Sequence, residues 1–198
     1  MKSNVCKIEN GSLDLSAILR ESEKVAVYNE LNHNQTLKLR LICEELDAML
    51  PSLVGEFDGD FWIDFEKGVC KINVLITFEE FTAKKKKALL AITKDQKNAA
   101  ATGFFGKIRS VIEDCFLDKE KAKFYDMAGL FNFANAYSTQ TDYSCMCSLQ
   151  QYKHVIQQED KKQEWDELEK SIITSCADDV IVGVKGKQAN IVIIKKFY

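Results

Sequence analysis

The strongest constraint in this sequence is an alternation of apolar and polar residues on both sides of a turn at Lys67-Gly68. Apolar side chains occupy every second position before and after that turn, at Phe61, Ile63, Phe65, Cys70, Ile72, Val74, Ile76 and Phe78. Successive strand side chains point to opposite faces, so the pattern predicts a β-hairpin with one apolar face. Such a face has to be covered by a second layer.

The stretch from Leu37 to Val54 supplies a candidate for that layer. Its apolar residues recur at steps of three and four, at Leu39, Ile42, Leu46, Met49 and Leu53. This spacing predicts an amphipathic helix lying on the hairpin, with Asn34 or Thr36 as its cap. At about 100° per residue, Glu44 points away from the apolar stripe, whereas Glu45 lies on its margin beside Met49.

The remaining segments complete the order of elements. We expect a helix over 13–31, a helical insertion at about 80–144 and a strand within 143–152. These are followed by a helix and then by a second hairpin turning at Gly186-Lys187. The inner stripe of this helix consists of Trp165, Leu168, Ile172, Ile173 and Cys176. The sequence therefore predicts a single α+β domain over 1–198. Its architecture is a two-layer sandwich, with helices on one face of a mixed, mainly antiparallel sheet.

Composition excludes several classes of partner. The formal net charge is −3, and the run Lys84–Lys87 fits the solvated face of a helix, so we expect neither nucleic acid nor an acidic membrane as a partner. No apolar run approaches the roughly 20 residues of a membrane helix. The seven cysteines are odd in number and irregularly spaced, which favours reduced thiols in a cytoplasmic protein without a secretory signal.

Two stretches, LRLICEELDAM (39–49) and LEKSIITSCADDVIVGVKGKQANIVIIKK (168–196), taken with the order of elements, resemble the GHKL superfamily. That superfamily includes histidine kinases, HSP90-type chaperones and anti-sigma-factor serine kinases. The resemblance implies a helix carrying E-x-x-x-N, in which the Glu acts as general base or orients water and the Asn binds Mg²⁺ with ATP. It also implies that the 80–144 insertion stands in the place of the ATP lid.

Three elements of the family's ATP site are absent or replaced here. Glu45 matches the Glu position, but Met49 stands at the Asn position and offers no oxygen ligand to Mg²⁺. The D-x-G-x-G box should follow Phe78, where the chain reads TFEEFTAKKKK without glycine. The glycine-rich end of the lid is replaced by QQEDKKQEWDEL (157–168), whose acidic side chains would repel phosphate.

The sequence offers few residues for chemistry. Glu45 is the candidate catalytic residue; the alternative, favoured by the lack of Asn at 49, is a helix-margin carboxylate facing solvent or a backbone donor. Gly103, Gly106 and Lys107 are the candidate nucleotide contact, although their spacing is not that of a P-loop and also fits a packed helix start. Cys145 and Cys147 lack further ligands for zinc, so we expect core packing and no metal site.

These observations favour a regulatory or signalling protein on a degenerate GHKL ATPase-like scaffold. We expect it to act by binding an unidentified protein, with weak or no nucleotide binding; ATP and Mg²⁺ are implied only by the resemblance. An active ATP-dependent protein serine kinase of the anti-sigma-factor type is the alternative, and a structural domain without a ligand is a third. An aromatic run from Phe124 to Tyr143 fits either a docking face or the core of the insertion, and a homodimer stays open.

Overall fold

The computed structural model describes residues 1–9, 15–54, 57–78, 106, 108–109, 145–158, 165–166, 168 and 171–198. Its elements, in chain order, are β1 (Cys6–Glu9), α1 (Leu15–Tyr28), α2 (His33–Val54), β2 (Phe57–Glu66), β3 (Val69–Phe78), β4 (Cys145–Ser148), α7 (Leu149–Gln158), α9 (Ile172–Cys176), β5 (Asp179–Lys185) and β6 (Gln188–Lys196).

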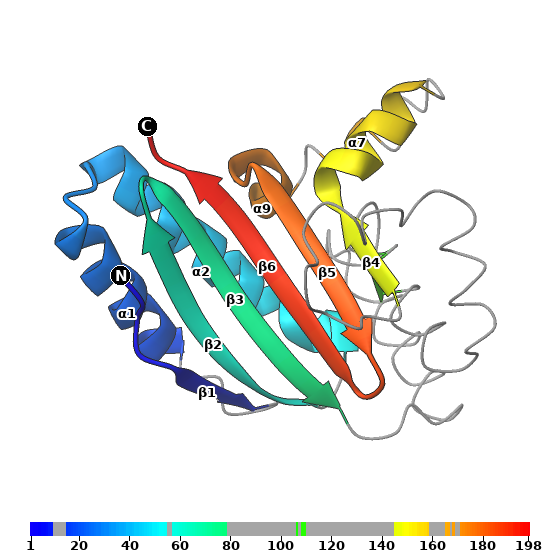
Figure 1. Cartoon of the computed structure of the whole chain (residues 1–198), viewed down its shortest axis with the longest axis horizontal. Coiled ribbons are helices and arrows are strands. Elements are labelled where there is room, and N and C mark those ends of the chain that lie inside the picture. Colours follow the sequence, from blue (N-terminus) through cyan, green and yellow to red (C-terminus); the bar gives the residue numbers. More distant parts are fainter. Residues whose placement is uncertain are drawn as a thin grey trace.

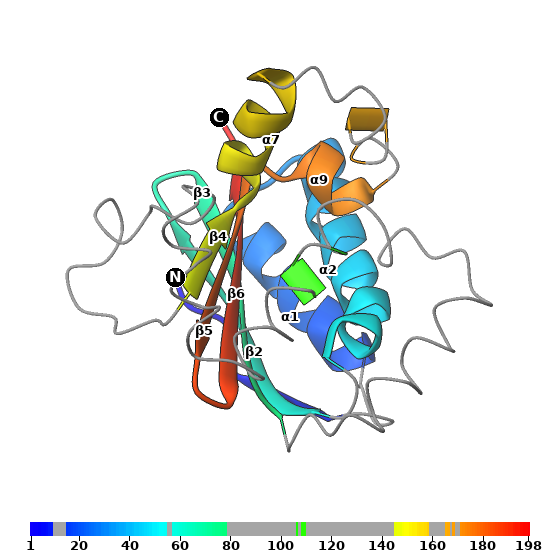
Figure 2. The ribbon, with the colours of Figure 1, turned by 90° about the vertical axis from the view of Figure 1, so that its right-hand side faces the viewer.

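The strands form one six-stranded sheet in the order β1-β2-β3-β6-β5-β4 (Figure 1). Helices α1, α2 and α9 lie on one side of it (Figure 2), so the two-layer α+β architecture is confirmed. Every pairing between the described strands is antiparallel, so the sheet is not mixed over this part of the chain.

Both expected hairpins are present, and backbone geometry explains the tight turn of the first. Lys67 and Gly68 have φ of 50° and 77°, the paired positive values that a two-residue turn needs to match the twist of its strands. The register pairs Ile63 with Ile72, which places the alternating apolar residues on a common face. In the second hairpin, Gly186 takes the positive φ, at 55°.

Helix α2 covers the apolar face of the sheet, as its stripe predicts. Its expected core residues are all 4% exposed or less, namely Leu39, Ile42, Leu46, Met49 and Leu53. They belong to the same buried cluster as the inward side chains of β2, β3, β5 and β6. Cys43 and Cys70 lie in this cluster, and the described cysteines 6, 43, 70, 147 and 176 are free thiols.

The expected cap of α2 is wrong by a few residues. The Asn32 side chain accepts a hydrogen bond from Gln35 N at 3.0 Å, and the Gln35 side chain accepts one from Asn32 N at 2.9 Å. This reciprocal pair is a capping box, so the helix begins at His33. Asn34 and Thr36, the residues expected to cap it, therefore lie inside the first turn.

Other differences concern short elements. The strand expected over 143–152 ends at Ser148, and α7 follows directly because Leu149, Tyr152 and Ile156 are buried at helical spacing. The four-residue strand β1 was not predicted. The expected lid insertion, the Lys84–Lys87 run and the Phe124–Tyr143 aromatic run lie outside the described residues, apart from Gly106, Ile108 and Arg109. No described helix is long and apolar enough to cross a membrane.

Candidate functional site

Glu45, the candidate catalytic residue, lies on the margin of α2 that faces α9, and its carboxylate is bound to the start of that helix. Ser171 Oγ donates to Oε1 at 3.0 Å, Ile172 N donates to the same oxygen at 3.2 Å, and Ile173 N donates to Oε2. The first N–H groups of a helix have no partner within it, so a side chain that accepts from them stabilises the helix start. Glu45 therefore caps α9 across a separation of more than 120 residues.

Ser171 is the N-cap of the same helix and was not singled out from the sequence. Its backbone is extended, and its hydroxyl accepts from Thr174 N at 3.4 Å while donating to Glu45. Helix α9 is thus capped twice, once by its own serine and once by a carboxylate from α2. A serine directly before an apolar helical stretch was the only sequence signal available for this arrangement.

Met49, at the position of the family's metal-binding Asn, is only 4% exposed and belongs to the buried core. A buried thioether packs well in such a place but offers no oxygen to a hard cation. Among the described residues, no group of three or more His, Cys, Asp or Glu side chains could hold a metal ion. The α2 margin therefore provides a carboxylate without a neighbouring cation ligand.

A further carboxyl, Asp47, lies on α2 two residues beyond Glu45. Two residues correspond to about 200° around a helix, so these carboxyls point to different sides and form no acid–base pair. Asp47 Oδ1 is buried and has no hydrogen-bond partner, and burial raises the pKa of this carboxyl.

The expected phosphate contact is largely outside the described residues. Gly103 and Lys107 are not described, and Gly106 is helical and half-buried. Ile108 and Arg109 beyond it are 1% and 7% exposed.

A second carboxylate, Asp179 at the start of β5, caps another helix. Its side chain is 6% exposed; Ser148 Oγ donates to its Oδ1 at 2.9 Å, and Gln150 N donates to Oδ1 at 3.1 Å. These donors stand at the beginning of α7. Asp179 belongs to a strand, and its side chain binds the strand–helix junction that precedes it in the chain.

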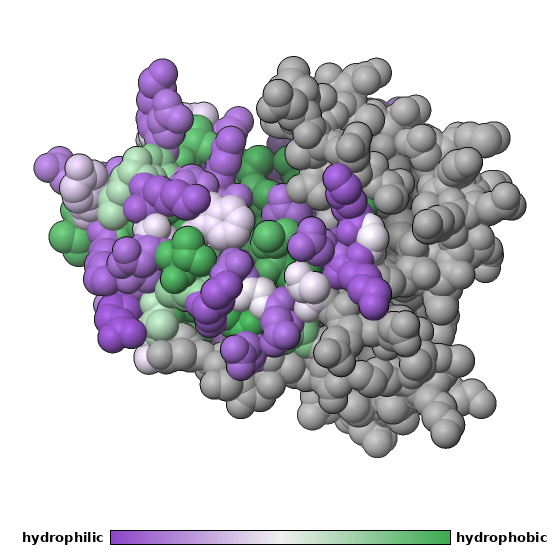
Figure 3. Space-filling model, turned by 60° about the horizontal axis from the view of Figure 1, so that its bottom comes forward, coloured by the Kyte–Doolittle hydropathy of each residue, from purple (hydrophilic) through white to green (hydrophobic). Residues whose placement is uncertain are grey.

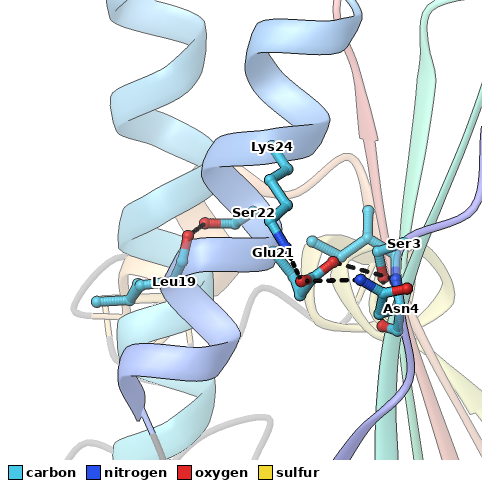
Figure 4. Close-up of polar contacts among 7 residues, drawn as sticks. Ser3, Asn4, Leu19, Glu21, Ser22 and Lys24 are labelled. Carbon is cyan, nitrogen blue, oxygen red and sulfur yellow. Dashed lines mark hydrogen bonds and ion pairs between the residues drawn. The ribbon is translucent and has the colours of Figure 1, made fainter.

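A third carboxylate, Glu21 on α1, holds the segment before β1 (Figure 4). Asn4 donates to it from both its backbone N, at 3.1 Å, and its side-chain amide, at 3.2 Å, and Lys24 donates at 2.6 Å. Burial alone would raise the pKa of Glu21, but the hydrogen bonds from Lys24 and Asn4 outweigh it and hold the pKa below its usual range.

No protein-family model, curated protein or solved structure matches the chain.

Proposed function

We propose that this chain is a regulatory or signalling protein on a degenerate GHKL ATPase-like scaffold, which acts by binding another protein and binds nucleotide weakly or not at all. The main support for this proposal is the set of hydrogen bonds that the Glu45 carboxylate accepts from the start of α9. The resemblance implies that this residue acts as general base or orients water, and that glycines at the end of the lid, just before the last helix, let backbone N–H groups approach phosphate. Here the carboxylate instead accepts from the N–H groups of Ile172 and Ile173 at the start of α9.

This contact disfavours nucleotide for two reasons. The first N–H groups of α9 already have an acceptor, and that acceptor carries a negative charge, which repels a second anion at the same helix end. Met49 adds no oxygen for the Mg²⁺ that would offset this repulsion. An active protein serine kinase would need Glu45 released from α9 and a metal held by other residues.

Exposed apolar side chains beside this margin support binding to a protein. Leu37 and Leu41 are 42% and 40% exposed on α2, and Ile172 on α9 is 41% exposed. Leu37, Leu41 and Glu45 are spaced by four residues and so follow one side of α2, while Ile172 donates its N–H to Glu45. An apolar row that ends at a capped helix start offers a protein partner area to bury.

A further pair of exposed residues extends this row over α1. Glu23 and Arg40 form an ion pair at 3.2 Å across the α1–α2 hairpin. Val27 follows Glu23 by four residues and is 79% exposed, and Leu37 precedes Arg40 by three. Each apolar side chain therefore lies one turn from the ion pair, toward the connection between the helices. We call Val27, Leu37, Leu41 and Ile172 the helix-side apolar row.

The protein-binding part of the proposal is tested by comparing affinity captures from extracts of the native cells. The wild-type chain is expected to retain a defined protein that a Leu37→Asp/Leu41→Asp variant loses, because charge in the row opposes burial. Tyr198→Asp, at a residue 88% exposed at the C-terminus, is the matched control and should retain the protein. Equal capture by all three chains, or no specific capture by the wild type, would contradict this part.

A further inference from the structure

The sheet has one face that no described helix covers. Helices α1, α2 and α9 lie behind the sheet in Figure 1 and on one side of it in Figure 2, whereas the opposite face turns toward the viewer of Figure 1. Side chains on this face alternate with the core residues of β1, β2, β3 and β6. We call it the open face; Lys7, Asp60, Trp62, Lys71, Leu75 and Val192 mark it.

The end of the open face at the β2–β3 turn is basic. A surface hollow of about 750 Å³ lies there, and its charged groups are the Met1 ammonium, Lys2, Lys67 and Lys71, against Asp64 and Glu66. Lys2 Nζ lies 5.0 Å from the centre of the Trp62 ring, which holds that ammonium over the sheet. The three lysines outnumber the two carboxylates, so the lining of this basic end carries an excess of positive charge.

The opposite end of the open face is acidic. A second hollow, of about 380 Å³, is lined by Glu9, Asp58 and Asp60, with Lys7 as the single cation. Lys7 pairs with Asp60 at 2.7 Å, whereas Glu9 and Asp58 stand directly opposite each other in the β1–β2 register. Like charges in that position are destabilising, and no ion pair among the described residues relieves these two. The lining of this acidic end carries an excess of negative charge, with three carboxylates against one lysine.

Between the two ends the open face is partly apolar. Trp62, Leu75, Val192 and Ile194 are each partly exposed there, and Trp62 and Val192 lie in one row through Asn73. Figure 3 shows hydrophobic side chains grouped among hydrophilic ones on the described part of the surface. This row lies midway along β3 between Lys71 at the basic end and Leu75, which lines the acidic hollow.

We propose that the open face binds a second copy of this chain, related by a two-fold axis near Trp62 and Asn73. In a two-fold interface, both copies use the same patch, and the two patches run in opposite directions. A residue at one end of the patch therefore contacts the other end of the partner's patch. The basic end of each copy then lies on the acidic end of the other, and the two central apolar rows pack together. The excess charges in the linings of the two hollows are opposite in sign.

The area of the open face indicates a dimer of low affinity. Four strands about 4.8 Å apart and about 20 Å long present a flat area of about 400 Å² per copy, about half of what a standard interface buries on each partner. The opposed charges steer association and set its register, and salt screens them. The dimer is therefore expected at micromolar or higher concentrations of chain and is weakened by salt.

Sedimentation equilibrium tests this inference with paired charge reversals. Lys67→Glu/Lys71→Glu makes the basic end acidic, and Glu9→Lys/Asp58→Lys makes the acidic end basic. Each variant alone is expected to be monomeric at concentrations where the wild type dimerises, because like ends then meet. An equimolar mixture of the two should recover the dimer, since both contacts between the unlike chains again join opposite charges.

A control variant and a salt titration complete the experiment. Arg20→Glu/Lys38→Glu makes the same change in net charge as Lys67→Glu/Lys71→Glu, but on the exposed surface of α1 and α2, and should dimerise as the wild type does. Circular dichroism checks that every variant is folded, and the wild-type salt titration does not depend on any variant. A wild-type chain that is monomeric at all concentrations, an equimolar mixture that stays monomeric, or a dimer indifferent to both reversals would each overturn the proposal.

Discussion

Two carboxylates each bind the start of a helix, yet their surroundings differ. Asp179 is 6% exposed and binds α7 from the adjacent strand β5, and its donors include the serine hydroxyl and backbone N–H at the start of that helix. Glu45 is partly exposed and reaches α9 from α2, which precedes it by most of the chain. The first is an internal part of the sheet layer, whereas the second lies where a ligand could reach it. The Glu45 carboxylate is therefore accessible to solvent and, at the same time, hydrogen-bonded to the start of α9.

The largest effect is expected from Asp179→Asn. The amide has one oxygen for donors that now share a carboxylate, and its NH₂ group faces those donors inside the protein. Since hydrogen bonds to a charged group are worth about 1.5–3 kcal/mol, we expect unfolding to require about 3 kcal/mol less. Urea denaturation measures this, with Asp166→Asn at an exposed site as control. A loss no greater than that of the control would remove the contrast between the two caps.

Glu45→Ala should cost less, because part of the site is open to water that can replace the carboxylate. Loss of a helix cap typically costs about 1 kcal/mol, and Ser171 remains to cap α9, so we expect about 1–2 kcal/mol. Glu44→Ala is the matched control: Glu44 bonds Arg40 at 2.9 Å on the exposed side of α2, and such a pair is worth about 0.3–0.5 kcal/mol. If the two substitutions destabilise equally, the α9 contact contributes no more to stability than an exposed ion pair does.

Glu21 extends the comparison to acid pH. Its pKa is held below the usual range by Lys24 and Asn4 despite burial, so the ionised form stabilises the fold. This contribution is complete above the pKa of an unfolded glutamate and is lost as the pH falls through the lower folded value. The difference in unfolding free energy between the wild type and Glu21→Gln should therefore shrink in acid. Denaturant unfolding at a series of pH values measures this difference. A difference that grows toward low pH would have the wrong sign.

The smallest perturbation is chemical labelling of thiols, which tests whether the layer between α2 and the sheet is closed. Burial raises the pKa of the Cys70 thiol to about 12 and raises that of Cys43 well above its ordinary value, so neither forms the reactive thiolate at neutral pH. Cys6 and Cys176 are partly exposed. Mass spectrometry after brief alkylation should find the second pair modified first. Early labelling of Cys43 would contradict a closed layer.

The fold could be predicted from the sequence in those segments where a pattern of apolar and polar residues repeats many times. The hairpin of β2 and β3 and the stripe of α2 each repeat their pattern over several residues, and both are confirmed. Short elements were missed because a strand of four residues, such as β1, shows too few alternations to stand out. The cap at Asn32 was missed because neighbouring polar residues, Asn34 and Thr36, offered the same chemistry.

The candidate site was only half predictable. The margin position of Glu45 follows from its angle on α2, whereas its partners do not, since Ser171 and Ile173 are brought to it only by tertiary packing. The partners of Asp179, Ser148 and Gln150, are likewise brought to it only by tertiary packing. The family resemblance, the role of Glu45 in any catalysis and the choice between regulator and kinase stay predictions.

The most direct test of the account is a calorimetric titration of Mg-ATP into the wild-type chain and into Glu45→Ala. We expect no saturable heat with the wild type at millimolar nucleotide, because the helix start is already bound by a carboxylate. ADP and Mg²⁺ alone serve as controls for weak anion or cation binding. A saturable heat with the wild type that disappears in Glu45→Ala would show a working nucleotide site and contradict the account.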